Sequence, residues 1–108
     1  MKMLLHENIP FRLYRDFTEE HQVYSVKYMG WEGFKNGELL HLMLIEKFEA
    51  LITWDQNFGF QQNFLKYPIA VFVLRSPGND YASLKPLIPK ILAIIKKGVP
   101  PGPTLIEA

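Results

Sequence analysis

The chain has 108 residues, of which 48% are hydrophobic and 14% aromatic, and its formal net charge is +1. This length predicts one domain, residues 1–108, with a core of its own, and a chain this apolar is not intrinsically disordered. The absence of cysteine excludes a disulfide framework, a Cys-ligated metal site and a cysteine nucleophile. No apolar run is long enough to cross a membrane and the first residues do not form a signal peptide, so we expect a cytoplasmic protein.

The first half of the chain predicts three strands and two helices. Residues 2–5 are apolar on both faces, as in a central strand of a parallel sheet. A helix begins at residues 8–10, where proline suits the first turn, and ends at residues 19–21. Its apolar side includes Phe11, Leu13, Tyr14 and Phe17. The remaining predicted elements are an alternating strand over 22–28, a helix over 38–48 and a buried strand over 50–54.

The second half predicts two helices and two strands. A short helix over 61–66 follows the loop at 55–60, and the apolar, β-branched run 69–74 is a buried strand. The longest helix begins at residue 81 or 82 and ends at Lys97, before Gly98. Pro89 either kinks this helix or moves its start to a later residue. Residues 104–107 form the last strand.

Strands and helices therefore alternate along the whole chain. This order predicts an α/β fold, a three-layer α/β/α sandwich with a mostly parallel central sheet and right-handed crossovers. In such sheets a functional site lies beyond the carboxyl ends of the strands, near the point where the strand order reverses.

Acidic and polar side chains stand at the predicted strand ends. His6 and Glu7 follow the first strand, Glu38 opens the second helix, and Asp55 follows the buried strand 50–54. Carboxylate oxygens suit Mg²⁺ or Mn²⁺, and such ions clamp the attacking and leaving oxygens of a phosphodiester. The alternative is that these acids only cap helices and offset helix dipoles.

The motifs at these positions resemble those of short, stand-alone PIN-like proteins. The opening Met3-Leu4-Leu5-His6-Glu7-Asn8-Ile9-Pro10 is similar to the LLDEN-[LI]-P start of that family. The resemblance continues over most of the chain, in residues 29–33, 35–40, 51–58, 61–63, 69–74 and 84–89. It implies a nuclease-like fold and, for PIN domains proper, a metal-dependent ribonuclease that is often the toxin of a bacterial toxin–antitoxin pair.

The resemblance implies a site of Asp55, Glu38, Glu7 and His6, with Mg²⁺ or Mn²⁺ held by Asp55, Glu38 and His6. The main departure is His6, which stands where the family has its first aspartate. Histidine is a poor Mg²⁺ ligand, although it joins Mn²⁺ sites. Glu7 points to the opposite side of the strand end and does not replace that aspartate. Asn57 stands where PIN nucleases often have a further acid.

Several polar and aromatic residues allow both a binding and a structural interpretation. The amides Asn57, Gln61, Gln62 and Asn63 are candidate contacts to a nucleotide or a partner, or else cap a short helix. Trp31, with Tyr28 and Phe34, either stacks on bases, anchors a loop in the core or forms a dimer contact. His41 lies one helical turn after Glu38 and either neighbours the site or is solvated.

Two functions follow from these observations. The first is a PIN-like ribonuclease acting through Mg²⁺ or Mn²⁺, with an antitoxin-like partner protein. The second is a catalytically inactive PIN-like module that binds a partner protein or nucleic acid; a homodimer through residues 28–34 is a third possibility. The acids lie mostly in residues 1–55, whereas residues 56–106 hold six bases and one acid. Either Lys66, Arg75 or Lys85 faces the Asp55 side of the sheet, where bases can flank a polyanion, or the two halves are simply solvated differently.

Overall fold

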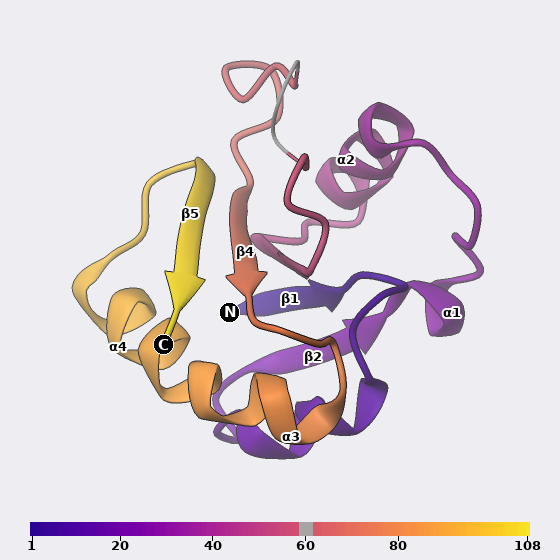
Figure 1. Cartoon of the computed structure of the whole chain (residues 1–108). Coiled ribbons are helices and arrows are strands. Elements are labelled where there is room, and N and C mark those ends of the chain that lie inside the picture. The colour runs from indigo at the N-terminus through magenta and orange to yellow at the C-terminus, as the bar shows by residue number, and fades with distance from the viewer. Residues whose placement is uncertain (59–61) are drawn as a thin grey trace.

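Five parallel strands form one sheet in the order β2-β1-β3-β4-β5 (Figure 1). The computed structural model describes residues 1–58 and 62–108. The strands are β1 (Lys2–Leu5), β2 (Gln22–Ser25), β3 (Ala50–Thr53), β4 (Ala70–Arg75) and β5 (Gly102–Glu107). The predicted α/β class and the parallel sheet are confirmed. None of the helices within the described ranges is long and apolar enough to cross a membrane.

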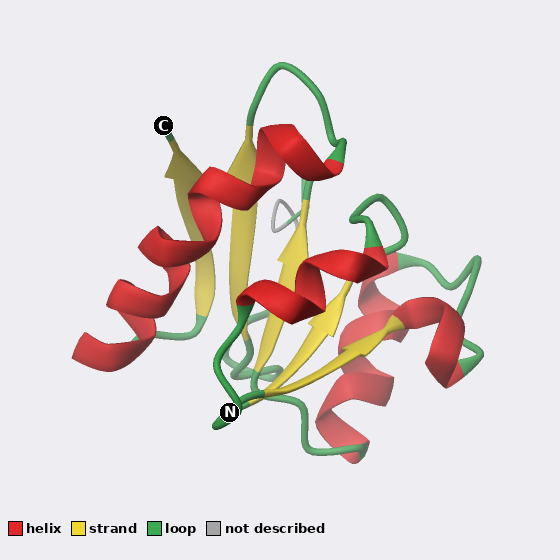
Figure 2. Cartoon of the chain, turned by 90° about the horizontal axis from the view of Figure 1, so that it is seen from below, coloured by secondary structure: helices red, strands yellow, loops and turns green. Residues whose placement is uncertain are grey.

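Helices cover both faces of this sheet (Figure 2). They are the 3-10 helices η1 (Phe11–Asp16) and η2 (Lys85–Leu87) and the α-helices α1 (Val26–Met29), α2 (Asn36–Ile45), α3 (Tyr81–Leu84) and α4 (Ile88–Lys97). Alternate residues of β1, β3 and β4 belong to two separate apolar clusters, one with η1, α3 and α4 and the other with α2. Both faces of the central strands are therefore buried, which explains their continuous apolar sequence.

Local hydrogen bonds shorten several predicted elements. The strand expected over 22–28 ends at Ser25, because the Ser25 side chain accepts a hydrogen bond from the Tyr28 backbone N–H at 3.0 Å and caps α1. The helix expected over 61–66 is absent from its described part, residues 62–66. There Asn63 Oδ1 accepts from the backbone N–H groups of Leu65 and Lys66, both at 3.1 Å, and forms a turn.

Prolines divide the long helix predicted over 81–97. Pro86 stands in the first turn of η2 and Pro89 in the first turn of α4, where the missing N–H groups need no partner. The prediction that Pro89 moves the start of the helix is confirmed, since α4 begins at Ile88.

The first helix is a 3-10 helix and not the α-helix expected. At three residues per turn, side chains three apart lie above one another. Leu13 is fully buried, whereas Phe11 and Tyr14 are 47% and 41% exposed. The prediction that Phe11 and Tyr14 share the apolar, inward side with Leu13 is therefore wrong.

The last crossover has the opposite hand to the first. The connection β1–η1–β2 and the connection β4–α3–α4–β5 step in opposite directions across the sheet, yet their helices cover the same face. Figure 2 shows the β4–α3–α4–β5 connection as the left-handed one. Crossovers between parallel strands are right-handed in about 98% of cases, so the expectation of right-handed crossovers fails here. As a result α3 lies beside η1, and the Tyr81 hydroxyl donates to Asp16 Oδ2 at 2.8 Å.

The 3-10 geometry of η1 leads to a test with neighbouring residues. Replacing Leu13 by alanine opens a cavity in the core, so we expect Leu13→Ala to lower the free energy of unfolding by about 2–5 kcal/mol. Tyr14→Ala removes a half-exposed ring and should cost less than about 1 kcal/mol. Urea unfolding of both variants measures the difference; equal losses would contradict the orientation described for η1.

Candidate functional site at the carboxyl edge of the sheet

The ends of β1 and β3 are joined by a hydrogen bond between two side chains. The sheet order reverses at this pair of strands, because β2 lies on one side of β1 and β3 on the other. His6 Nδ1 lies 2.7 Å from Thr53 Oγ1, and the Asp55 backbone N–H donates to the same oxygen at 3.0 Å. Thr53 thus holds His6 and Asp55 together at the position where α/β sheets bind ligands.

The hydrogen bonds of Thr53 favour one tautomer of His6. Thr53 is fully buried, and its hydroxyl oxygen already accepts from Asp55. A buried hydroxyl proton needs an acceptor, and His6 Nδ1 is the acceptor next to it among the described residues. The hydroxyl therefore donates to Nδ1, which leaves the proton of neutral His6 on Nε2.

Burial lowers the pKa of His6 below its ordinary value of 6.5, while the negative charges of Glu7 and Asp55 oppose this shift. The folded protein therefore binds a proton on His6 less readily than the unfolded chain. The stability that His6 contributes is present above about pH 6.5 and is lost as the pH falls through its folded-state pKa. At neutral pH His6 is uncharged.

The two nearby carboxylates each use one oxygen for a backbone contact. Asp55 Oδ1 accepts from the Asn57 backbone N–H at 2.9 Å, and Glu7 Oε1 accepts from the Gly33 backbone N–H at 2.9 Å. Their second oxygens accept no hydrogen bond from the described residues. His6, Glu7, Phe11 and Lys27 are among the residues that line a cavity of about 510 Å³ at this edge.

Glu38 occupies a different setting from the other predicted ligands. Its carboxylate accepts from the Lys35 backbone N–H at 3.3 Å and stands in the first turn of α2, where a negative charge suits the helix dipole. It lines a separate cavity of about 370 Å³ together with His41 and Tyr67. No three His, Asp or Glu side chains in residues 1–58 and 62–108 form a group that could hold a metal ion. Glu38 thus stands apart from His6 and Asp55, and the Mg²⁺ or Mn²⁺ site of these three residues stays a prediction.

The candidate amide residues are distributed over three places. Asn57 lies at the carboxyl edge, Gln62 Oε1 lies 3.7 Å from where a Cβ on Gly37 would stand, and Asn63 caps the turn at residues 64–66. Gln61 lies outside the described residues. Of these amides, Asn57 is the one beside the His6–Asp55 pair.

Asn57 lines a second cavity at this edge, of about 540 Å³. The cavity lies over β4 and β5, and its lining includes Gln56, Phe58, Val73, Arg75 and Leu105. The Phe58 ring also meets the His6 ring edge-on, with 5.5 Å between centroids. His6 lines one cavity and Phe58 lines the other, so the contact between their rings lies between the two cavities.

The three bases of the second half have separate positions. Arg75 lines the same cavity as Asn57, which lies two residues after Asp55. The Lys85 ammonium lies 3.9 Å from Asp16 Oδ1, on the η1 face. The Lys66 ammonium lies over the Tyr67 ring, 5.4 Å from its centroid. Arg75 is thus the base beside the candidate site.

Sequence reasoning missed Thr53 and Asn8. Asn8 Oδ1 accepts from the Trp54 backbone N–H at 3.0 Å, and the Asn8 backbone oxygen accepts from Asn79 Nδ2 at 2.9 Å. Thr53 is the one buried polar residue among those described. The sequence does contain an indication of Thr53, which is a polar residue inside the apolar run 50–54. A buried hydroxyl is unfavourable unless it has hydrogen-bond partners, so such a residue predicts polar neighbours.

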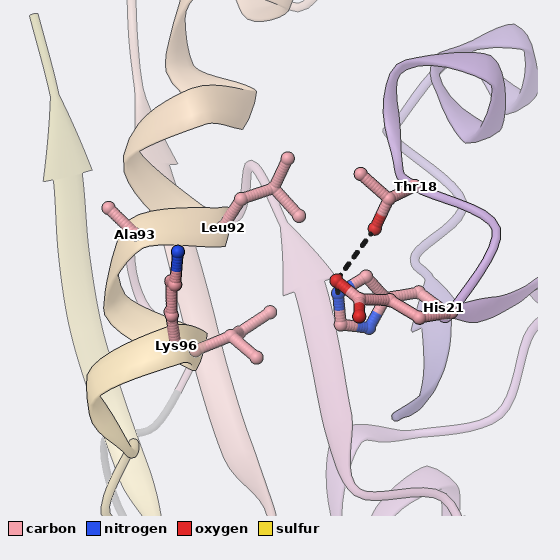
Figure 3. A pocket seen from close by; sticks show the side chains of 7 residues that line it. Thr18, His21, Leu92, Ala93 and Lys96 are labelled. Atoms are coloured by element: carbon pink, nitrogen blue, oxygen red, sulfur yellow. Dashed lines mark hydrogen bonds and ion pairs between the residues drawn. The ribbon is translucent and has the colours of Figure 1, made fainter.

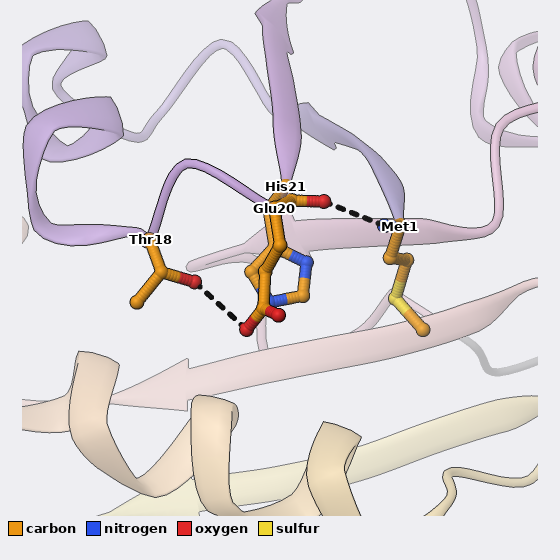
Figure 4. Close-up of polar contacts among 4 residues, drawn as sticks. All are labelled: Met1, Thr18, Glu20 and His21. Atoms are coloured by element: carbon orange, nitrogen blue, oxygen red, sulfur yellow. Dashed lines mark hydrogen bonds and ion pairs between the residues drawn. The ribbon is translucent and has the colours of Figure 1, made fainter.

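A further cavity, of about 520 Å³, lies at the opposite, amino edge of the sheet. Figure 3 shows the Leu92 side chain of α4 pointing toward Thr18, and Ala93 and Lys96 of the same helix also belong to the cavity lining. Glu20 Oε1 accepts from the Thr18 hydroxyl at 3.0 Å, and the Glu20 backbone oxygen accepts from the Met1 ammonium at 3.3 Å (Figure 4). The His21 side chain is 7% exposed, and its buried Nδ1 has no hydrogen-bond partner among the described residues.

Trp31 anchors its loop in the core. It is half-buried against the α2-side cluster and meets the Phe48 ring edge-on at 5.7 Å. Tyr28 is 73% exposed and Phe34 41% exposed. Of the three aromatic residues of this segment, Trp31 therefore matches the structural interpretation.

Comparison of the chain with protein-family models gave no match, and neither the curated proteins nor the solved structures gave one. The resemblance to PIN-like proteins therefore depends on the sequence motifs.

The charges around His6 lead to a prediction for its titration. The carboxylates of Asp55 and Glu7 raise the pKa of His6 against the effect of burial, so Asp55→Asn and Glu7→Gln should each lower that pKa further. Histidine ring signals followed by NMR against pH measure it. Glu32→Gln, in the same cavity lining, is the control and should shift it less; a rise in either test variant would contradict the argument.

The unpartnered nitrogen of His21 leads to a prediction about stability. A buried polar atom without a partner costs about 1–3 kcal/mol. His21→Leu replaces the ring by an apolar side chain of similar size and should raise the free energy of unfolding by about 1 kcal/mol. Thermal or urea unfolding above pH 7 measures this, with His41→Leu at an exposed site as the control; a loss of stability in His21→Leu would contradict it.

Proposed function

We propose that this chain is a PIN-like module that binds single-stranded RNA at the carboxyl edge of its sheet. The observation that carries the proposal is the cavity over β4 and β5, in which the amides of Gln56 and Asn57 and the guanidinium of Arg75 surround an apolar wall. Its volume of about 540 Å³ is within the usual range for small-ligand sites. Amides, a cation and an apolar wall are the groups that bind an unpaired nucleotide.

Each lining residue has a chemical part in this proposal. Gln56 Nε2 donates to the backbone oxygens of Trp54 and Leu74, at 2.8 and 2.7 Å, so its Oε1 is held as an acceptor for a base N–H group. The exposed Asn57 amide supplies a second donor and acceptor. Arg75 pairs with Glu107 at 3.7 Å, with both side chains more than half exposed. Such a pair contributes little energy, so a phosphate replaces the carboxylate at small cost.

A metal-dependent ribonuclease is the second candidate function. It is favoured by the position of Asp55 and Glu7, whose negative charges lie close enough to His6 to oppose the lowering of its pKa by burial. A single Mg²⁺ needs only one or two carboxylates when substrate phosphates supply further oxygens. We derive no reaction step through a metal, because Glu38 does not join these residues and His6 Nδ1 is held by Thr53. Binding without cleavage is therefore the function we favour.

Three further hypotheses from the sequence concern the location of the protein and its protein partners. A cytoplasmic location is part of this proposal. An antitoxin-like partner and a homodimer through residues 28–34 are alternatives, and the exposed Tyr28 ring is the feature that a homodimer would use.

RNA binding by the intact protein tests the proposal. We expect a fluorescein-labelled oligouridylate of about 12 nucleotides to bind with a fluorescence anisotropy change that weakens as salt rises. Arg75→Gln should reduce the slope of log affinity against log salt by about one, and Asn57→Ala should weaken binding at every salt concentration. Lys97→Gln, the same charge change on the exposed end of α4, is the matched control.

Two results would overturn the proposal. One is the absence of saturable RNA binding at low salt, and the other is an equal effect of Arg75→Gln and Lys97→Gln. The same RNA is also incubated with Mn²⁺ and with EDTA and analysed on a denaturing gel, where we expect it to stay intact. Mn²⁺-dependent cleavage by the wild type that is lost in Asp55→Asn would establish the second candidate function instead.

A further inference from the structure

The 3-10 helix η1 presents two exposed rows of side chains. Because side chains three apart lie above one another in such a helix, Phe11 and Tyr14 form one row and Arg12 and Arg15 form the other. The third row, Leu13 and Asp16, faces the core and α3. All four residues of the first two rows are exposed.

The aromatic row is a partly exposed stacked pair, and the Arg15 guanidinium lies 5.8 Å from the centroid of the Tyr14 ring. The rings of Phe11 and Tyr14 are 4.9 Å apart between centroids, with an angle of 22° between their planes. They are 47% and 41% exposed, although burial of such rings is strongly favourable. An unpaired base has a flat face of the same kind and can extend this stack.

The arginine row is supported by α3, which the left-handed crossover places beside η1. The Arg12 guanidinium lies 4.2 Å from the centroid of the Tyr81 ring, and the Lys85 ammonium lies 5.5 Å from the same ring. The one acid of η1, Asp16, is contacted by the Tyr81 hydroxyl at 2.8 Å and by Lys85 at 3.9 Å. Its negative charge is thus offset by Lys85, and Arg12 and Arg15 leave this surface positive.

These rows continue from the carboxyl-edge site. Phe11 lines the same cavity as His6, the His6 ring meets the Phe58 ring, and Phe58 lines the cavity with Asn57 and Arg75. The Asn57–Arg75 cavity and η1 are therefore linked through contacting residues, but this link includes the buried Phe58, and Glu7 and Glu32 also line the cavity beside Phe11.

We propose that Phe11 and Tyr14 form a base-stacking platform for single-stranded RNA, with Arg12 and Arg15 contacting the phosphates beside the stacked bases. This inference rests on the proposed function, because the platform extends a binding site whose first part is the Asn57–Arg75 cavity. Rings together with arginines match the two chemical parts of a single strand, which are flat bases and regularly spaced negative charges. An acidic protein has the charges but lacks the bases.

The test compares ring variants on two oligonucleotides of the same length. Phe11→Ala and Tyr14→Ala should each weaken binding of the fluorescein-labelled oligouridylate by about tenfold. Phe11→Tyr and Tyr14→Phe keep the aromatic faces and should bind as the wild type does. The matched control is Phe34→Ala, which removes another ring that is 41% exposed and should have no effect.

An abasic oligonucleotide of the same length separates stacking from charge. The wild type should bind it more weakly than the oligouridylate, and the two alanine variants should bind it as well as the wild type does. Arg15→Gln should weaken binding of both oligonucleotides. Circular dichroism and urea unfolding of each variant confirm that it is folded.

Three outcomes would overturn the inference. The first is unchanged oligouridylate binding by both alanine variants, and the second is equal wild-type affinity for the abasic and base-containing strands. The third is competition by poly-glutamate that depends on Phe11 and Tyr14, which would assign the surface to an acidic protein. If the wild type binds RNA and only Arg75→Gln and Asn57→Ala weaken it, the platform fails while the proposed function stands; if the wild type binds no RNA, both fail.

Discussion

The pairing of β1 with β3 is the contact on which the candidate site depends. β1 is the first element of the chain, but it lies inside the sheet between β2 and β3. Its apolar residues Met3, Leu4 and Leu5 are buried on both faces, and the ladder ends with the His6 backbone N–H donating to the Ile52 oxygen at 2.9 Å. This register brings His6 to Thr53, so any shift between the two strands would separate His6 from Asp55 as well.

Much of the fold could be predicted because burial on both faces leaves a strong pattern in the sequence. The runs at 2–5, 50–54 and 69–74 are apolar throughout, which identifies them as interior strands before any pairing is known. The rule that sites lie beyond carboxyl strand ends then selected His6, Glu7 and Asp55, and these residues do lie near one another. Pro89 moved the start of the last helix as its chemistry requires.

What could not be predicted depends on choices that the local pattern does not encode. The spacing of Phe11, Leu13 and Tyr14 is compatible with an α-helix and with a 3-10 helix, and only the packing of Leu13 distinguishes them. Glu38 matches the motif that resembles the PIN-like family, and its observed contact is a local one, to the Lys35 backbone N–H. The hydrogen bond between Thr53 and His6 joins residues 47 positions apart in the chain. The spacing of apolar residues does not predict such a contact.

The hand of the last crossover has a consequence for both faces of the sheet at once. A right-handed connection would have laid α4 over the Val73 and Leu105 side of β4 and β5, where a helix would close the cavity of Asn57 and Arg75. The left-handed connection instead leaves that side to the segment between β3 and β4. Reversing one connection would thus remove the cavity of Asn57 and Arg75 from one face and Tyr81 and Lys85 from the other. The topology of residues 76–101, which contribute no residue to that cavity, is therefore what keeps it open.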